Sequence, residues 1–137
     1  MNQKANKLLS FLNETIDYFL KKYKSIDKNR YFADRDARAI LDKTINDIIL
    51  CIVDICEEIL KINNRTIPDT YKDTVLACYE FIGDLALKLA PLTKHRNETI
   101  HQYLKMNWYN IQIVKSKLPE IQDFLKKTQN IFNSYGQ

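Results

Sequence analysis

The residues of this chain that are best suited to chemistry are concentrated in one short segment, residues 95–103, which reads His-Arg-Asn-Glu-Thr-Ile-His-Gln-Tyr. Both histidines of the chain, His95 and His101, lie in this segment together with Arg96 and Tyr103. Histidine accepts and donates protons near neutral pH, and arginine stabilises negative charge that develops on a phosphoryl group. The residue types therefore favour acid–base chemistry on an anionic substrate.

Arg96 occupies a position where the sequence pattern calls for an apolar residue. Steps of three and four lead from Leu85, Leu89 and Leu92 to Arg96, Thr99 and Tyr103, which predicts one helix over about residues 85–104. A guanidinium group on an apolar face is costly unless it has partners. An ion pair with an acid on a neighbouring helix would give Arg96 a purely structural role. A functional site that uses the guanidinium group would explain it equally well. Both explanations remain open.

The spacing limits what one copy of the segment can do. On an ideal helix Arg96 and Tyr103 lie about 20° apart around the axis and about 10 Å apart along it. His101 lies about 140° from Arg96 but only about 40° from Asn97. Arg96 and His101 can converge if the helix bends, if the arginine wraps around it, or if a second chain supplies the other half. We therefore expect a homodimer in which residues 96–103 of the two copies approach each other.

Helical periodicity extends along the whole chain. The apolar stripes predict five helices, at about residues 8–24, 31–62, 71–82, 85–104 and 107–132. The second helix has two adjacent apolar rows and should therefore be central. Thr70 and Asn107 are predicted N-caps, and Gly83 is suited to the end of a helix. Pro91 should either kink the fourth helix or break its first turn from the rest, and Pro119 implies a bend. The expected architecture is all-α, a four- to five-helix up-and-down bundle in a single domain spanning residues 1–137.

Composition excludes several classes of protein. With only 2 glycines and 3 prolines in 137 residues, the chain has too few turn residues for an all-β fold. A hydrophobic content of 45% argues against global disorder, and a net charge of +4 permits a polyanionic partner without requiring one. Cys51, Cys56 and Cys78 form no Cys-x-x-Cys pair and are expected to be small buried residues in a reducing cytosol. The longest apolar run, residues 48–53, is too short to span a membrane.

The motif segment resembles a known signature. Arg96, Asn97, His101 and Tyr103 are similar to the Arg-x4-His-x-Tyr motif of HEPN-domain toxins of the HepT family, the partners of minimal nucleotidyltransferase (MntA-type) antitoxins. The resemblance covers about residues 30–132 and includes the following further features: Pro68 with Tyr71, the Gly83 turn, Leu89-Ala90 and Leu118-Pro119-Glu120-Ile121. The sequence departs from the family pattern at Pro91, at Lys94-His95 and at the polar pair Glu98-Thr99.

The resemblance implies a HEPN-like homodimer that is the toxin of a type VII-like toxin–antitoxin module. Its activity would be that of a metal-independent endoribonuclease on tRNA or mRNA, with Arg96 and His101 as catalytic residues and Asn97 and His95 in support. The resemblance implies no cofactor, no DNA substrate and no association with a membrane. Tyr103 would accept AMP from the nucleotidyltransferase antitoxin. Glu98 is the only acid in the motif, so the residues give no support to a two-metal nuclease.

Two other functions remain compatible with the sequence. The bundle could be a non-catalytic binding subunit that docks a nucleotidyltransferase, or a structural dimer in which Arg96 forms an ion pair. The basic residues between Lys21 and Arg30 could contact an RNA backbone or form a solvated helix end. Trp108 could stack on a base or pack in the core.

Overall fold

Helix α3 (Arg35–Ile62) lies at the centre of the structure, which is a computed structural model that describes residues 2–94 and 100–135 and, for residues 100–106, only the backbone. Both apolar rows of α3 are largely buried, as the sequence pattern predicts. The fully buried positions include Leu41, Ile48, Ile55 and Ile59. Because two adjacent rows need cover, α3 contacts helices on both of its sides, and the prediction that it is central is confirmed.

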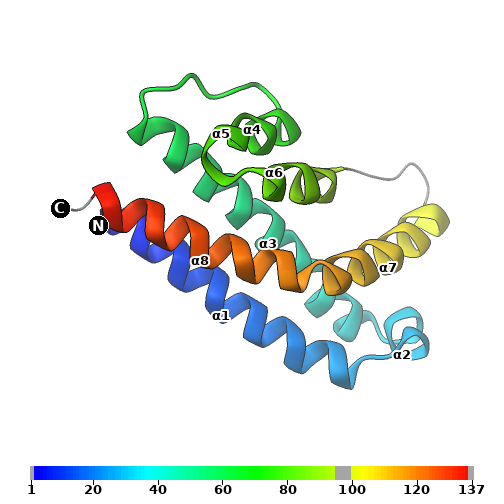
Figure 1. Ribbon diagram of the computed structural model, residues 1–137. Coiled ribbons are helices and arrows are strands. Elements are labelled where there is room, and N and C mark those ends of the chain that lie inside the picture. The colour runs from blue at the N-terminus through cyan, green and yellow to red at the C-terminus, as the bar shows by residue number, and fades with distance from the viewer. Residues whose placement is uncertain (1, 95–99, 136–137) are drawn as a thin grey trace.

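Two long helices cover one side of α3. Helix α1 (Gln3–Ser25) and helix α8 (Leu118–Tyr135) run side by side, so that the two ends of the chain lie close together (Figure 1). The predicted stripe of α1 faces the core through Leu12, Ile16 and Phe19. Near the C-terminal end of α1, the Tyr23 hydroxyl donates a hydrogen bond of 2.6 Å to the side chain of Gln112 in helix α7 (Ile100–Ser116).

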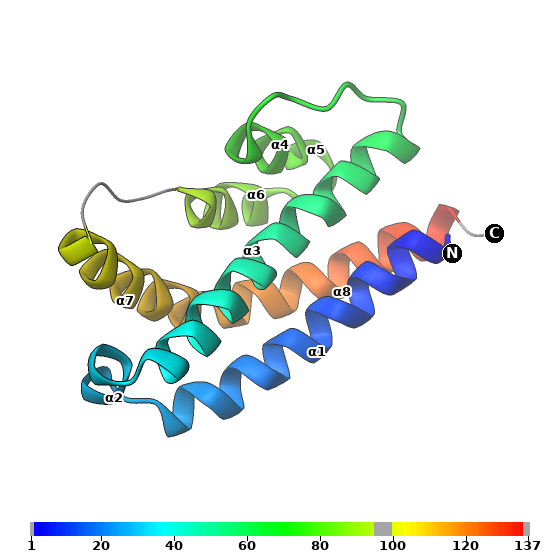
Figure 2. The same cartoon turned by 180° about the vertical axis from the view of Figure 1, so that it is seen from behind.

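Four short helices and the longer α7 complete the bundle at the two ends of α3. Helices α4 (Tyr71–Ala77), α5 (Tyr79–Ile82) and α6 (Asp84–Leu89) lie near its C-terminal half, and α2 (Lys28–Ala33) and α7 lie near its N-terminal end (Figure 2). A 3-10 helix, η1 (Ala90–Thr93), follows α6. The described residues contain no strand, and the prediction of an all-α bundle is confirmed. Within these ranges no helix combines the length and apolarity that crossing a membrane requires.

Several predicted helix ends coincide with real ones. The Thr70 hydroxyl caps α4 by accepting a hydrogen bond of 3.1 Å from the Asp73 amide, and Gly83 ends α5 with φ +63°. The predicted helix over residues 31–62 is divided at Asp34, which caps α3. The hydrogen bond from the Ala37 amide holds the pKa of the Asp34 carboxyl below its ordinary value.

The prediction of one helix over residues 85–104 is wrong. Pro91 lies in the first turn of η1, and the chain becomes extended at Lys94, with φ −68° and ψ 139°. Proline lacks an amide hydrogen and its ring clashes with the preceding turn, so it ends α6 and opens a new element. Helix α7 begins at Ile100. It therefore includes Asn107 within its length, and the prediction that Asn107 is an N-cap is also wrong.

The three cysteines are buried and carry free thiols, as expected. The Cys51 thiol donates a hydrogen bond of 3.2 Å to the Leu8 carbonyl, and the Cys78 thiol donates one of 3.4 Å to the Cys56 carbonyl. Burial raises the pKa of Cys51 to about 12. These thiols therefore act as small packing groups between helices.

Replacing Gly83 by alanine should destabilise the protein by about 1–3 kcal/mol, because its φ of +63° and ψ of −139° strain any L-residue. A Cβ at this position would have no atom within 4 Å, so the cost comes from the backbone alone. Urea denaturation measures the change. Asn64, with φ +58°, provides the control, since Asn64→Gly should leave stability unchanged or slightly raised. An unchanged midpoint for Gly83→Ala would contradict the prediction.

Candidate functional site

The structure places the motif at the junction between η1 and α7. His95, Arg96 and Asn97 lie outside the described residues. His101 and Tyr103 belong to the first turns of α7, where the backbone alone is described. The angle predicted between Arg96 and His101 depends on residues 95–99, which lie outside the described residues, so it stays a prediction. The homodimer likewise stays a prediction and is part of the proposal below.

A cavity of about 390 Å³ lies beside this junction. Its walls come from α3, from η1 with the adjoining Lys94, and from α7. The lining residues are Asp42, Lys43, Ile45, Asn46, Ile49, Leu92, Lys94, Asn107 and Asn110. Lys94 precedes Arg96 by two residues, and Asn107 follows Tyr103 by one helical turn. The cavity thus touches the chain on both sides of the motif.

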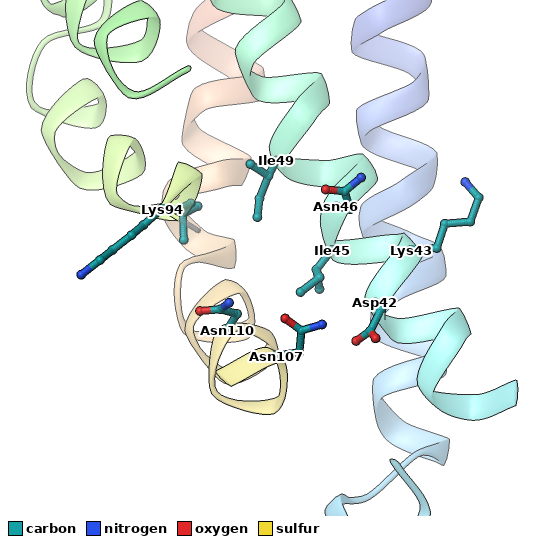
Figure 3. A pocket seen from close by; sticks show the side chains of 9 residues that line it. Asp42, Lys43, Ile45, Asn46, Ile49, Lys94, Asn107 and Asn110 are labelled. Atoms are coloured by element: carbon teal, nitrogen blue, oxygen red, sulfur yellow. The ribbon is translucent and has the colours of Figure 1, made fainter. Parts of the chain in front are cut away.

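The polar side chains of the cavity come from two different helices. Asp42, Ile45 and Asn107 point toward one another across the space between α3 and α7, and Asn110 lies beside Asn107 (Figure 3). Lys43 and Lys94 extend away from this group (Figure 3). Lys43 forms an ion pair of 2.7 Å with Asp47. The inner part of the cavity therefore presents amides and a carboxylate, with the ammonium groups outside.

Tyr31 orients the Asp42 carboxylate of this cavity. It is fully buried in α2, and its hydroxyl donates a hydrogen bond of 2.6 Å to Oδ1 of Asp42. Its ring lies 5.2 Å from the ring of Trp108, centroid to centroid. Trp108 is half-buried, so its described role is packing between α2 and α7. One tyrosine therefore links α2, α3 and α7 and orients a carboxylate of the cavity.

Asn107 is the most buried polar residue that lines the cavity. It is 8% exposed, no hydrogen bond joins its side chain to another described residue, and its amide atoms remain accessible, since they are not among the fully buried atoms that lack a partner. Buried amides in folded proteins nearly always have partners, in protein or solvent. The amide of Asn107 borders the cavity. Solvent or a molecule bound in the cavity would therefore be its partner.

The basic residues at the α1–α2 connection have structural contacts. Arg30 donates a hydrogen bond of 2.8 Å to the Ser25 carbonyl and lies 3.5 Å from Asp34. Lys22 and Lys24 occupy the last turn of α1, where a positive charge complements the helix dipole. These contacts favour a solvated helix end over an RNA contact.

The residues that line the cavity were not among the site residues predicted from the sequence. Asp42 and Asn46 flank the buried Ile45 on α3, and Asn107 and Asn110 interrupt the apolar face of α7. Their signal was present, because each polar residue adjoins a position that periodicity assigns to a buried face. What the sequence did not reveal is that two separate helices bring these residues to one place.

Removing the Tyr31 hydroxyl should destabilise the bundle. Tyr31→Phe keeps the ring contact with Trp108 but deletes the hydrogen bond to the Asp42 carboxylate, for an expected loss of about 1.5–3 kcal/mol. Urea denaturation followed by circular dichroism measures it. Tyr109→Phe is the matched control, because Tyr109 is 59% exposed, and it should change stability by less than about 0.5 kcal/mol. Equal effects of the two substitutions would show that the hydrogen bond contributes nothing.

The chain matches a known protein family. A family model described as ribonuclease HepT-like matches residues 5–128, which include the motif, the cavity and all the helices that surround them. No curated protein and no solved structure shows significant similarity to the chain. The match spans well over half of the sequence and agrees with the all-helical bundle. The chain therefore belongs to the HepT-like ribonuclease family.

Proposed function

We propose that the protein is the toxin of a toxin–antitoxin module and cleaves RNA as a metal-independent endoribonuclease. Arg96 and His101 carry the chemistry, with Asn97 and His95 in support. The observation that carries the proposal is the family match, because the matched residues 5–128 contain the whole Arg-x4-His-x-Tyr segment. The cavity between α3 and α7 supports it, since a substrate held there would adjoin both ends of the motif.

The cleavage uses the substrate's own nucleophile. The ribose 2′-oxygen forms a bond to the adjacent phosphorus, and the bond from phosphorus to the 5′-oxygen breaks. One proton leaves the 2′-hydroxyl, and another is delivered to the departing 5′-oxygen, which are the two steps that histidine catalyses near neutral pH. Arg96 stabilises the added charge of the pentacoordinate transition state. A homodimer would bring two copies of His101, one for each proton transfer.

The proposed regulation acts on Tyr103. A nucleotidyltransferase antitoxin would transfer AMP from ATP to the Tyr103 hydroxyl, with pyrophosphate as the leaving group. The new phosphate would place negative charge seven residues from Arg96, within the same motif. It would compete with the RNA phosphate for that cation. Modification would thereby stop cleavage without unfolding the protein.

Substitution of the motif should separate catalysis from folding. His101→Ala should lower the cleavage rate by about 10²–10⁴-fold, because a proton-transfer group is lost. Arg96→Ala should abolish cleavage at similar thermal stability. The measurement is cleavage of labelled RNA in EDTA, with the ends identified by mass spectrometry. We expect 2′,3′-cyclic phosphate and no cleavage of the matching DNA. Strict dependence on Mg²⁺ would refute the mechanism.

Growth assays distinguish the toxin from a non-catalytic binding subunit. Expression of the wild-type chain should arrest growth, and expression of His101→Ala should not. Arrest that persists in His101→Ala would favour the binding subunit. Arrest by neither protein would contradict the role as a toxin.

Tyr103→Phe should escape neutralisation. It keeps the ring but lacks the hydroxyl that accepts AMP, so the variant should still cleave RNA and arrest growth when the nucleotidyltransferase is co-expressed. Intact-mass measurement should show the added adenylyl group on the wild-type chain only. Tyr109→Phe, an exposed position of the same helix, serves as the control and should still be modified. Equal modification of wild type and Tyr103→Phe would exclude Tyr103 as the acceptor.

A further inference from the structure

The cavity beside the motif has the form of a site for a flat polar molecule. Ile45, Ile49 and Leu92 give it apolar walls, and Asp42, Asn46, Asn107 and Asn110 give it a hydrogen-bonding side. Its volume of about 390 Å³ lies within the range of ordinary small-molecule sites, about 300–1,000 Å³. A nucleobase combines an apolar face with a hydrogen-bonding edge and matches both kinds of wall.

The polar groups of the cavity select among the bases. A carboxamide donates and accepts side by side, which matches the N6 amine and N7 of adenine. A carboxylate only accepts, so Asp42 also matches an exocyclic amine. Guanine instead presents two acceptors, O6 and N7, whose usual partners are arginine and lysine. Lys43 is paired with Asp47, and both Lys43 and Lys94 extend away from the amides (Figure 3).

Asn107 points to an occupant of this kind. It is 8% exposed, borders the cavity and has no side-chain partner among the described residues. Asn110 follows it by three residues on α7, so the two amides lie on nearly the same face of one helix. Across the cavity, the Tyr31 hydroxyl holds the Asp42 carboxylate in place from outside. The hydrogen-bonding side is therefore set by packed helices before any ligand arrives.

We propose that this cavity is a base-specific subsite that binds an adenine of the RNA substrate next to the cleaved phosphate. Asn107 and Asn110 contact the N6 and N7 edge, Asp42 accepts from the N6 amine, and the apolar walls pack against the ring. This inference rests on the proposed ribonuclease function and adds a substrate preference to it. Lys94 lines the cavity and precedes Arg96 by two residues in the sequence.

Nucleotide binding tests the subsite without requiring cleavage. The full-length protein is titrated with the 3′-monophosphates of adenosine, guanosine, cytidine and uridine, by calorimetry and by NMR of the asparagine side-chain amides. We expect adenosine 3′-monophosphate to bind about tenfold more tightly than guanosine 3′-monophosphate. The Asn107 amide signals should shift on binding. In Asn107→Asp and in Asn110→Asp the preference should fall severalfold, because the donor to N7 is replaced by an acceptor.

Asn13→Asp is the matched control, since it makes the same change in charge and shape at an exposed position of α1. It should keep the adenine preference. Equal binding of all four nucleotides by the wild type would overturn the inference. So would an unchanged preference in both Asn107→Asp and Asn110→Asp when circular dichroism shows that they are folded.

A parallel cleavage assay separates the subsite from the ribonuclease activity. Short RNAs that differ only in the base next to the cleaved phosphate should be cut fastest when that base is adenine, and Asn107→Asp should reduce this difference. Cleavage with no preference would refute the subsite and leave the ribonuclease proposal standing. Specific binding of adenosine 3′-monophosphate with no cleavage of any RNA would refute the ribonuclease proposal and leave an adenine-binding cavity.

Discussion

The two adjacent apolar rows of α3 impose the main constraint on this structure. A helix with such a wide apolar face has to be covered on more than one side, and α1 with α8 covers one side while α4 and η1 cover another. Near the N-terminal end of α3, Asp42 and Asn46 interrupt the apolar rows. The cover there is α7, which brings its own amides and leaves a cavity. The candidate site thus lies where the apolar packing of the central helix is interrupted.

Tyr31 links this polar region to the rest of the bundle. Its buried ring contacts Trp108, and its hydroxyl binds Asp42, so α2 joins α3 and α7 although it is only six residues long. A helix that short gains little stability from its own hydrogen bonds, so it depends on these contacts and on the hydrogen bonds that Arg38 of α3 donates to its carbonyls. The same contacts orient the carboxylate at the cavity. One residue therefore contributes both to the packing of α2 and to the orientation of Asp42.

Much of the fold could be predicted from the sequence, because burial and periodicity follow the same pattern. Leu12, Ile16 and Phe19 on α1 and the two rows on α3 lie where their spacing predicts, and Gly83 ends a helix as its conformational freedom suggests. The break near residue 94 was missed because steps of three and four continue from Leu92 to Tyr103 as if the helix continued. Pro91 indicated a kink or a broken first turn, but not that the chain would become extended at Lys94.

The candidate site was only partly predictable for a related reason. The motif residues could be found because their types are unusual and they are close in sequence. The cavity instead joins Asp42 to Asn107, which are distant in sequence and come together only because α7 packs against α3. The arrangement assigns two tasks to different elements. Packed helices hold the cavity, and the motif extends in sequence from the residues after Lys94 into the first turns of α7. Binding of a base and cleavage of the phosphodiester would then be separable, because residues that bind on α3 and α7 can change without altering Arg96 or His101.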